Sequence, residues 1–236
     1  MKKSVILFRS LQFEDLDNTA KLLLKYSSTD TYDILDEKLS GRIKGKEGRR
    51  KVINNLMRVW GNGKKTHCEL QSKVIERYVV SSYNDKIVFQ ILMTYLTIPF
   101  FAEALGIVGR YFRMSDKVQS KTILNEVRNR YGITETVKKG SLALLGSLTN
   151  WGILETNKKG QYSYEGNKIE IRNRFLKNLL VKSILTHSEA EYISLEAINN
   201  QAGFFMFDYL ITGTDIEFKD IEVLRERSHT FVKLKK

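Results

Sequence analysis

The sequence has 236 residues, 42% of them hydrophobic and 28% charged, which is typical of a soluble globular protein with two or three packed subdomains. Its single cysteine, Cys68, excludes an internal disulfide and fits a reducing compartment, and three widely separated histidines exclude a Cys/His metal cluster. Lysine and arginine outnumber aspartate and glutamate by 39 to 27, so the net charge of +12 favours association with polyanions, although solubility alone also accounts for it.

Residues 1–84 are predicted to form an N-terminal helical region. The apolar run at residues 5–8 is too short for a signal peptide, so we expect a short strand or tail against the body of a cytoplasmic protein. Apolar positions at helical spacing predict helices through residues 16–24 and 32–39, separated by a capping stretch rich in serine and threonine.

A basic loop follows these helices. Residues 39–65 contain nine basic residues and one acidic residue, and Gly41, Gly45 and Gly48 loosen the chain among them. Such a loop, entering a basic helix, can follow the phosphate backbone of DNA or RNA. A solvated loop and a contact with an acidic protein remain alternatives. The predicted nucleic-acid-binding residues here are Arg42, Lys44, Lys46, Arg49, Arg50 and Lys51.

The most apolar part of the chain is the uncharged stretch over residues 87–102. Pro99 interrupts it, and the run is shorter than the roughly 18–20 residues that a bilayer requires. The pattern therefore favours two buried core helices that meet at Pro99 over a membrane span, and no membrane partner is expected.

Residues 85–166 are predicted to contain a winged helix-turn-helix-like unit. A first helix is expected over residues 118–131 and ends at Gly132, a residue suited to a helix C-terminus. Thr134 or Thr136 can cap a second helix, which ends at residues 151–152. A strand starting at residues 153–154, a tight turn and a return strand then predict a small β-hairpin.

The second helix of such a unit is the element that enters a DNA groove. Lys138 and Lys139 near its start, and Lys158 and Lys159 at the hairpin tip, can neutralise phosphates. The Arg, Asn and Gln side chains that distinguish base pairs are missing from its first two turns, so weak sequence specificity or none is expected. A protein-contact module with solvated lysines is the alternative.

Residues 167–236 are predicted to form a C-terminal helical region with a short terminal strand. A long helix is expected over residues 169–185, a further helix near Ser194, and a strand over residues 230–234. The aromatic run at residues 204–207 is predicted to be core, with a docking surface for a protein partner as the alternative.

No motif in the chain indicates catalysis. A phosphate-binding loop ending in Lys-Ser or Lys-Thr is missing, so we expect no enzymatic activity, no cofactor and no bound metal. The spacing of Asp215, Glu217 and Lys219 is similar to that of metal-dependent phosphodiesterases, in which acids hold the ion and a lysine steadies developing charge. A nuclease is therefore kept as the weakest hypothesis.

The layout of the chain resembles a known family. The segment before the helix over residues 52–60, the apolar helices around Pro99 and the segment 131–154 are similar to the small helical accessory protein of BREX phage-defence systems. Residues past about 185 have no counterpart in it. The resemblance implies a non-enzymatic, basic, mostly helical protein that binds DNA within a defence complex and therefore has other protein subunits as partners.

Together these patterns predict a cytoplasmic, non-enzymatic accessory protein that binds double-stranded DNA with low sequence specificity, with RNA as a possible ligand. The alternatives are a protein-interaction scaffold within a larger complex and, less favoured, a metal-dependent nuclease.

Overall fold

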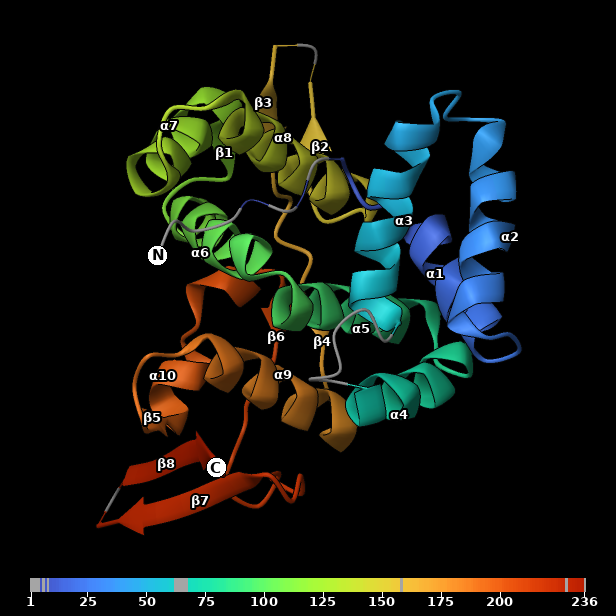
Figure 1. Ribbon diagram of the computed structural model, residues 1–236. Coiled ribbons are helices and arrows are strands. Elements are labelled where there is room, and N and C mark those ends of the chain that lie inside the picture. Colours follow the sequence, from blue (N-terminus) through green and yellow to red (C-terminus); the bar gives the residue numbers. More distant parts are fainter. Residues whose placement is uncertain are drawn as a thin grey trace.

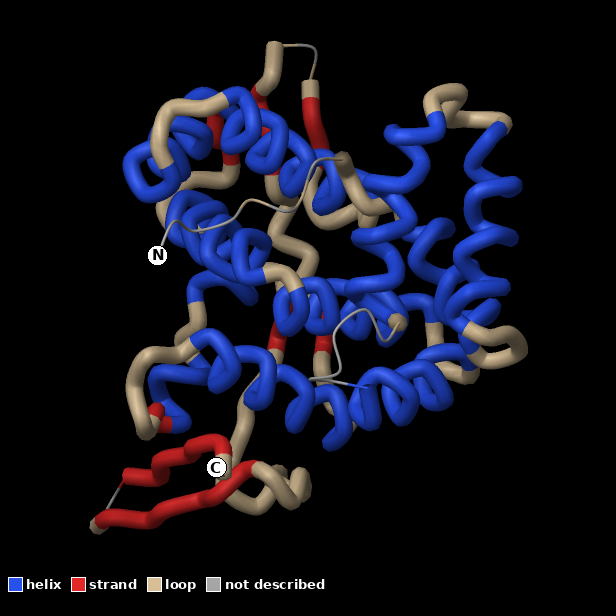
Figure 2. Tube along the Cα trace, in the orientation of Figure 1, coloured by secondary structure: helices blue, strands red, loops and turns tan. Residues whose placement is uncertain are grey.

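The computed structural model describes residues 5, 7, 9–61, 68–157, 159–227 and 229–235. Over these residues the fold is mainly α, as the sequence predicts, and its short strands form three small sheets (Figures 1 and 2). The longer helices are α1 (Phe13–Leu23), α2 (Ser28–Ser40), α3 (Lys46–Trp60), α4 (Cys68–Val79), α5 (Tyr83–Thr97), α6 (Pro99–Phe112), α7 (Ser120–Tyr131), α8 (Glu135–Asn150) and α9 (Arg174–His187).

Helix α1 lies in the middle of the N-terminal helices and contacts α2, α3, α4 and α5. The side chain of Ser27 caps α2 by accepting a hydrogen bond from the Asp30 amide at 3.1 Å, as the sequence indicates. Asp17 on α1 accepts a hydrogen bond from the Tyr78 hydroxyl on α4 at 3.0 Å and pairs with Lys86 on α5 at 3.2 Å. One carboxylate thus connects three helices.

The predicted basic loop is shorter in the structure. Helix α3 begins at Lys46, so Gly48 lies inside the helix and the connecting loop covers only residues 41–45. The buried positions Val52, Leu56 and Val59 follow helical spacing, and their packing extends the helix back over the glycine.

Helices α5 and α6 form the centre of the fold. Ten consecutive residues of α5, 87–96, are buried, and Pro99 starts α6 at a position where its missing N–H costs no hydrogen bond. The two helices bend by 118° at the break, as the proline predicts. Among the described residues no single helix has the length and apolarity to cross a membrane; α5 and α6 meet that test only when joined.

Residues 117–163 fold as strand β1 (Lys117–Gln119), α7, α8, strand β2 (Glu155–Thr156) and strand β3 (Gln161–Ser163). The sheet order is β1-β3-β2, and Tyr162 pairs with both Val118 and Thr156 in antiparallel register. The predicted hairpin is confirmed, but Val118 lies in β1 and not in the first helix. Its strand conformation follows from pairing with β3, which local helical spacing does not reveal.

The turn between α7 and α8 follows the sequence signals closely. Gly132 has a φ of 89°, a left-handed value that suits glycine, and ends α7. The side chain of Thr134 accepts a hydrogen bond from the Val137 amide at 3.2 Å and caps α8. Trp151 is 1% exposed and anchors the other end of α8 in the core.

The C-terminal region differs most from its prediction. Residues expected to start a long helix form β4 (Ile169–Glu170), which pairs in parallel with β6 (Phe207–Asp208), and α9 begins only at Arg174 after an Asn173 cap. Ser194 caps α10 (Leu195–Asn199) as predicted, and η2 (Ala202–Phe204) follows it. The predicted terminal strand is confirmed as β8 (His229–Leu234) in a sheet of order β5-β8-β7, with β5 (Ile193–Ser194) and β7 (Ile221–Glu226).

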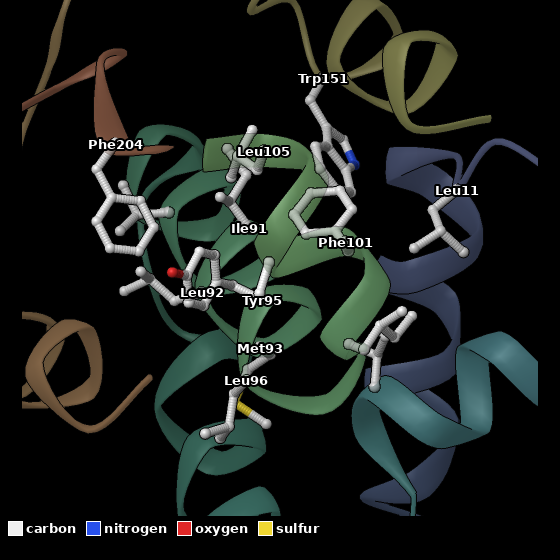
Figure 3. Close-up of a cluster of buried hydrophobic side chains, with 14 of the residues drawn as sticks. Leu11, Ile91, Leu92, Met93, Tyr95, Leu96, Phe101, Leu105, Trp151 and Phe204 are labelled. Carbon is white, nitrogen blue, oxygen red and sulfur yellow. The ribbon is translucent and has the colours of Figure 1, made fainter. Parts of the chain in front are cut away.

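One hydrophobic cluster joins all these regions, from Leu7 to Val232. Helices α5 and α6 supply its middle, where Phe101 and Trp151 meet edge to face with ring centroids 5.8 Å apart (Figure 3). The cluster therefore fixes α8 against α6.

Candidate nucleic-acid interface

The outward face of α8 carries the lysines that the sequence singles out. Lys139 is exposed, whereas Lys138 is partly exposed and lies 3.6 Å from Glu135 one turn earlier. Leu142 is 42% exposed on the same face. The start of α8 thus presents a mixed surface of two lysines, one glutamate and a leucine.

Lys139 lines a groove with two arginines from distant parts of the chain. The groove has a volume of about 540 Å³, and its walls include Arg9 from the N-terminal segment and Arg42 from the loop after α2. Arg42 forms an ion pair with Asp15, which also lines the groove. We call this feature the basic groove; its full lining is Arg9, Ser10, Gln12, Asp15, Arg42, Ile43, Val52, Lys139, Leu142 and Ala143.

Arg9 is a residue that the sequence analysis did not identify. It stands alone near the N-terminus, without basic neighbours closer than residues 2 and 3, so no local pattern marks it. In the structure its guanidinium lies against α3, where a Cβ on Gly48 would be only 3.3 Å from Nη2. Glycine at position 48 therefore leaves room for Arg9 beside the groove.

The N-terminal segment also covers part of α8. The Leu11 amide donates to the Ser147 hydroxyl at 2.8 Å, and the Phe13 amide donates to Asn150 Oδ1 at 2.6 Å. A Cβ on Gly146 would lie 2.2 Å from Ser10 Oγ, so the segment packs directly on the helix. Val5 of the same segment lies beside Gly140, where a Cβ would be 2.6 Å from Val5 Cγ1, but Lys139 and Leu142 on the first half of α8 stay exposed.

The other basic residues of the N-terminal region fall into two groups. Lys44 is exposed in the loop, and Lys46, Arg50 and Lys51 are exposed on the first turns of α3. Arg50 pairs with Glu47 at 2.8 Å, one turn away. An exposed pair of this kind is weak, so the guanidinium can exchange Glu47 for another anion at small cost.

Arg49 has a different environment from its neighbours. Its Nε lies 2.7 Å from Asp36 Oδ1, and its Nη1 donates to the carbonyl oxygens of Ile43 and Lys44 at 3.1 and 3.0 Å. Its side chain is only 13% exposed. These partners already use the donors of the guanidinium, so we assign Arg49 to shaping the loop rather than contacting a ligand.

The hairpin tip is the third place where the sequence predicts cations. Lys159 is exposed there, whereas Lys158 lies outside the described residues. The side chain of Asn157 accepts hydrogen bonds from the amides of Lys159 and Gln161 at 3.0 and 3.2 Å, and Gly160 has a φ of 70°. The hairpin and the loop after α2 both project at the upper end of the molecule in Figure 1.

The aromatic run that was an alternative docking surface is core. Phe204 is 2% exposed, Phe205 7% and Phe207 3%. These rings pack among themselves and against α5 and α6, for example Phe204 on Tyr95 with centroids 4.9 Å apart. The run therefore has little area to offer a partner.

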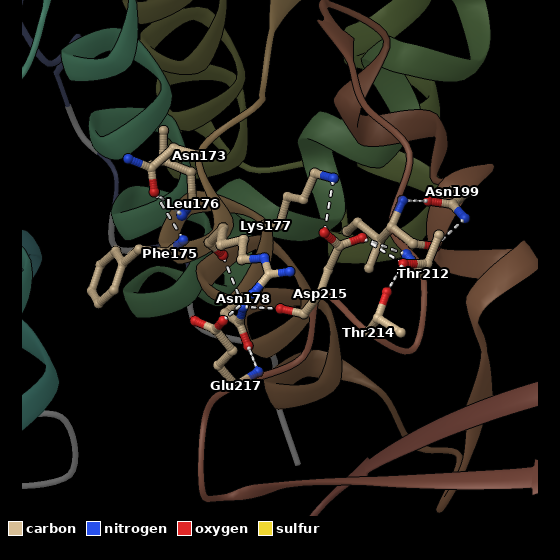
Figure 4. Close-up of polar contacts among 12 residues, drawn as sticks. Asn173, Phe175, Leu176, Lys177, Asn178, Asn199, Thr212, Thr214, Asp215 and Glu217 are labelled. Carbon is tan, nitrogen blue, oxygen red and sulfur yellow. Dashed lines mark hydrogen bonds and ion pairs between the residues drawn. The ribbon is translucent and has the colours of Figure 1, made fainter.

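The acids of the nuclease hypothesis are already engaged by cations and by the loop around them (Figure 4). Asp215 pairs with Lys177 at 3.1 Å and accepts a hydrogen bond from the Thr212 hydroxyl at 2.8 Å, and Glu217 pairs with Arg174 at 2.6 Å. Within the part of the chain that the structure describes, no three His, Cys, Asp or Glu side chains come together as a metal site. His67 and the side chain of Cys68 lie outside that part.

Comparison of the chain with profiles of known families, with curated proteins and with solved structures found no match. The residues of the basic groove are therefore interpreted from their own geometry and charge.

Proposed function

We propose that this protein binds double-stranded DNA through its phosphate backbone, with low sequence specificity and without catalysing a reaction. The observation that carries the proposal is the convergence of Arg9, Arg42 and Lys139 on one groove beside the start of α8. Cations that are distant in sequence but gathered on one surface are typical of a site that neutralises phosphates.

The topology of residues 117–163 supports a duplex as the ligand. A strand, two helices and a hairpin whose return strand lies between the other two strands are the parts of a winged helix-turn-helix. In that arrangement α8 approaches the major groove of the duplex. The hairpin, which carries Lys159, lies beside that groove. The loop cations Lys44 and Lys46 extend the same interface along the backbone.

Low specificity follows from what covers α8. Because the N-terminal segment lies on the second half of the helix, that half cannot enter a major groove as deeply as an uncovered recognition helix. The open half presents Glu135, Lys139 and Leu142, which supply no bidentate base contact of the Arg–guanine or Asn–adenine kind. Backbone contacts therefore dominate the proposed complex.

Binding to short fluorescent duplexes of unrelated sequence, measured by anisotropy over a range of salt concentrations, tests this function. We expect similar affinities for all duplexes and a slope of log K against log salt of about −5, the value for roughly six neutralised phosphates. The variant Lys44→Glu/Lys46→Glu/Lys139→Glu is expected to lower affinity at least about tenfold.

The matched control reverses charge elsewhere. Lys25 between α1 and α2, Lys73 on α4 and Lys219 before β7 are exposed, and the connection between α1 and α2 lies at the end of that helical pair away from the loop after α2 (Figure 1). The triple variant Lys25→Glu/Lys73→Glu/Lys219→Glu reverses the same number of charges and should leave binding nearly unchanged. Equal losses in both variants would indicate nonspecific attraction to net charge, and no binding at low salt would refute the proposal. A stronger affinity for single-stranded RNA would assign the groove to RNA instead.

The layout resemblance adds a cellular role to this proposal: a cytoplasmic accessory subunit of a BREX phage-defence system, bound to other proteins of the complex. Co-purification with the defence methyltransferase or ATPases is the measurement that tests it. A protein that binds DNA but none of these partners would keep the molecular function and remove the role.

A further inference from the structure

A second cavity lies between the end of α6, the segment after β3 and the stretch from α10 to β6. Its volume is about 350 Å³, within the usual range of about 300–1,000 Å³ for small-molecule sites. Aromatic rings form much of its wall, and amide and charged groups complete it. We call it the aromatic cavity; the rings are Phe112, Tyr164, Phe204, Phe205, Phe207 and Tyr209.

The wall of the aromatic cavity is held in place before any ligand arrives. A Cβ on Gly109 of α6 would lie 1.8 Å from the carbonyl oxygen of Ala202, so α6 and η2 are in backbone contact. The side chain of Asn199 bonds both the amide and the carbonyl of Ile211, at 2.8 and 3.0 Å. A preformed wall of this kind lowers the conformational entropy lost when a ligand binds.

The rings differ in how much surface they offer a ligand. Phe112 and Phe205 stack on each other with centroids 5.4 Å apart and are 6% and 7% exposed, so their faces are largely used. Tyr164 and Tyr209 are half-buried and keep ring area toward the cavity. Half-buried aromatic rings suit a planar group that stacks or packs edge to face.

Charged and amide groups stand at the rim. Arg113, Lys168 and Asp208 are exposed cavity residues, and their charges sum to +1. Asn200 is exposed and Gln201 half-buried in the same wall. The cavity therefore combines aromatic surface, amides that match the polar edge of a heterocycle, and two cations that suit a phosphate.

We propose that the aromatic cavity binds a nucleoside monophosphate unit, with its base against Tyr164 and Tyr209 and its phosphate beside Arg113 and Lys168. Asp208 can accept a hydrogen bond from a ribose hydroxyl or a base amino group. The unit comes either from a free nucleotide or from the end of a nucleic-acid strand. This site is separate from the basic groove and does not depend on duplex binding.

Isothermal titration calorimetry of the full chain with AMP, GMP, UMP and adenosine tests the proposal. We expect saturable one-to-one binding of at least one mononucleotide and affinity about tenfold weaker for adenosine than for AMP if AMP binds, because adenosine lacks the phosphate. Arg113→Ala and Lys168→Ala, both at exposed positions, should each weaken mononucleotide binding about three- to tenfold. Lys73→Ala, an exposed lysine on α4, is the matched control and should have no effect.

A 5′-phosphorylated dinucleotide distinguishes the two sources. If it binds and free mononucleotides do not, with the same loss in Arg113→Ala and Lys168→Ala, the unit belongs to a strand end. The proposal is overturned if none of these compounds binds at millimolar concentration, or if both variants bind as the unchanged chain does. Duplex binding should persist in both variants, so failure here is distinguishable from failure of the proposed function.

Discussion

Arg49 on α3 and Asp36 on α2 form a two-point ion pair, with Nε 2.7 Å from Oδ1 and Nη2 3.1 Å from Oδ2. The same guanidinium donates to two carbonyl oxygens of the loop between the helices. The hydrogen bonds between the two side chains raise the pKa of Arg49 and lower the pKa of Asp36, because they stabilise the charged form of both groups. The pair therefore fixes the loop that places Arg42 and Lys44.

Arg49→Lys is expected to lower the melting temperature and to speed hydrogen–deuterium exchange in residues 41–45. Lysine keeps the charge but cannot make the fork of hydrogen bonds that guanidinium makes. Arg50→Lys, at an exposed position on the same helix where the guanidinium pairs with Glu47, is the control and should melt like the unchanged chain. Melting by circular dichroism and exchange by mass spectrometry measure both effects; equal melting of the two variants would contradict the assigned role.

Asp17 is expected to make stability sensitive to acid. Partial burial works to raise its pKa, but hydrogen bonds from Lys21, Lys86 and Tyr78 prevail and hold the pKa below its ordinary 3.8. The carboxylate thus contributes stability that is present above pH 3.8 and is lost as pH falls through the lowered value. Asp17→Asn should cost about 2 kcal/mol at neutral pH and less below pH 3.8, as read from urea denaturation. A cost that does not change with pH would contradict this prediction.

His187 should make the stability of the fold depend on pH in a second, higher pH range. Its Nε2–H donates to the carbonyl oxygen of Tyr95 at 2.7 Å, and burial lowers the pKa of the imidazole below 6.5 although hydrogen bonds to Tyr95 and Leu96 and the charge of Glu103 oppose this. The unfolded chain therefore takes up the proton first, so stability is complete above pH 6.5 and declines as pH falls toward the lowered value.

His187→Gln can keep a donor toward the carbonyls without titrating. The difference in unfolding free energy between this variant and the unchanged chain should vary between pH 7 and pH 5, with the unchanged chain losing more as the pH falls. Chemical denaturation at several pH values gives this difference. Parallel pH profiles would show that His187 does not titrate differently on folding.

Gly106 and Gly109 on α6 give a matched test of packing. A Cβ on Gly106 meets nothing within 4 Å, whereas one on Gly109 would lie 1.8 Å from the Ala202 carbonyl. Gly106→Ala should therefore stabilise by up to about 1 kcal/mol, the helix preference of alanine over glycine. Gly109→Ala should destabilise by about 3 kcal/mol or more, because α6 and η2 must separate. Opposite signs in denaturant unfolding are the expected result, and a Gly109→Ala variant no less stable than the unchanged chain would refute the close contact.

The sequence could predict elements whose signals are local. Gly132 and Thr134 mark the turn between α7 and α8, and Pro99 marks the break between α5 and α6, because each acts on its own or adjacent backbone. It could not place β4, since Ile169 becomes a strand only by pairing with Phe207 across the fold. Two-residue strands of this kind carry no period that distinguishes them from the start of a helix.

In the candidate site too, local features can be predicted from the sequence, whereas contacts between distant residues cannot. The run of basic residues is visible in the sequence, but the difference between Arg49 and Arg50 depends on whether a carboxylate such as Asp36 is near in space. Arg9 joins Lys139 only because the N-terminal segment crosses α8. Spacing along the chain contains neither of these relationships.

The contact between the N-terminal segment and α8 has a consequence for the order of folding during synthesis. The amide of Leu11 finds its partner, the Ser147 hydroxyl, only after 136 further residues have been added. On the ribosome the segment before α1 therefore lacks this partner until α8 has left the exit tunnel, whereas α1, α2 and α3 can already contact one another. The contact that holds the N-terminal segment on α8 therefore forms after more than half of the chain has been made.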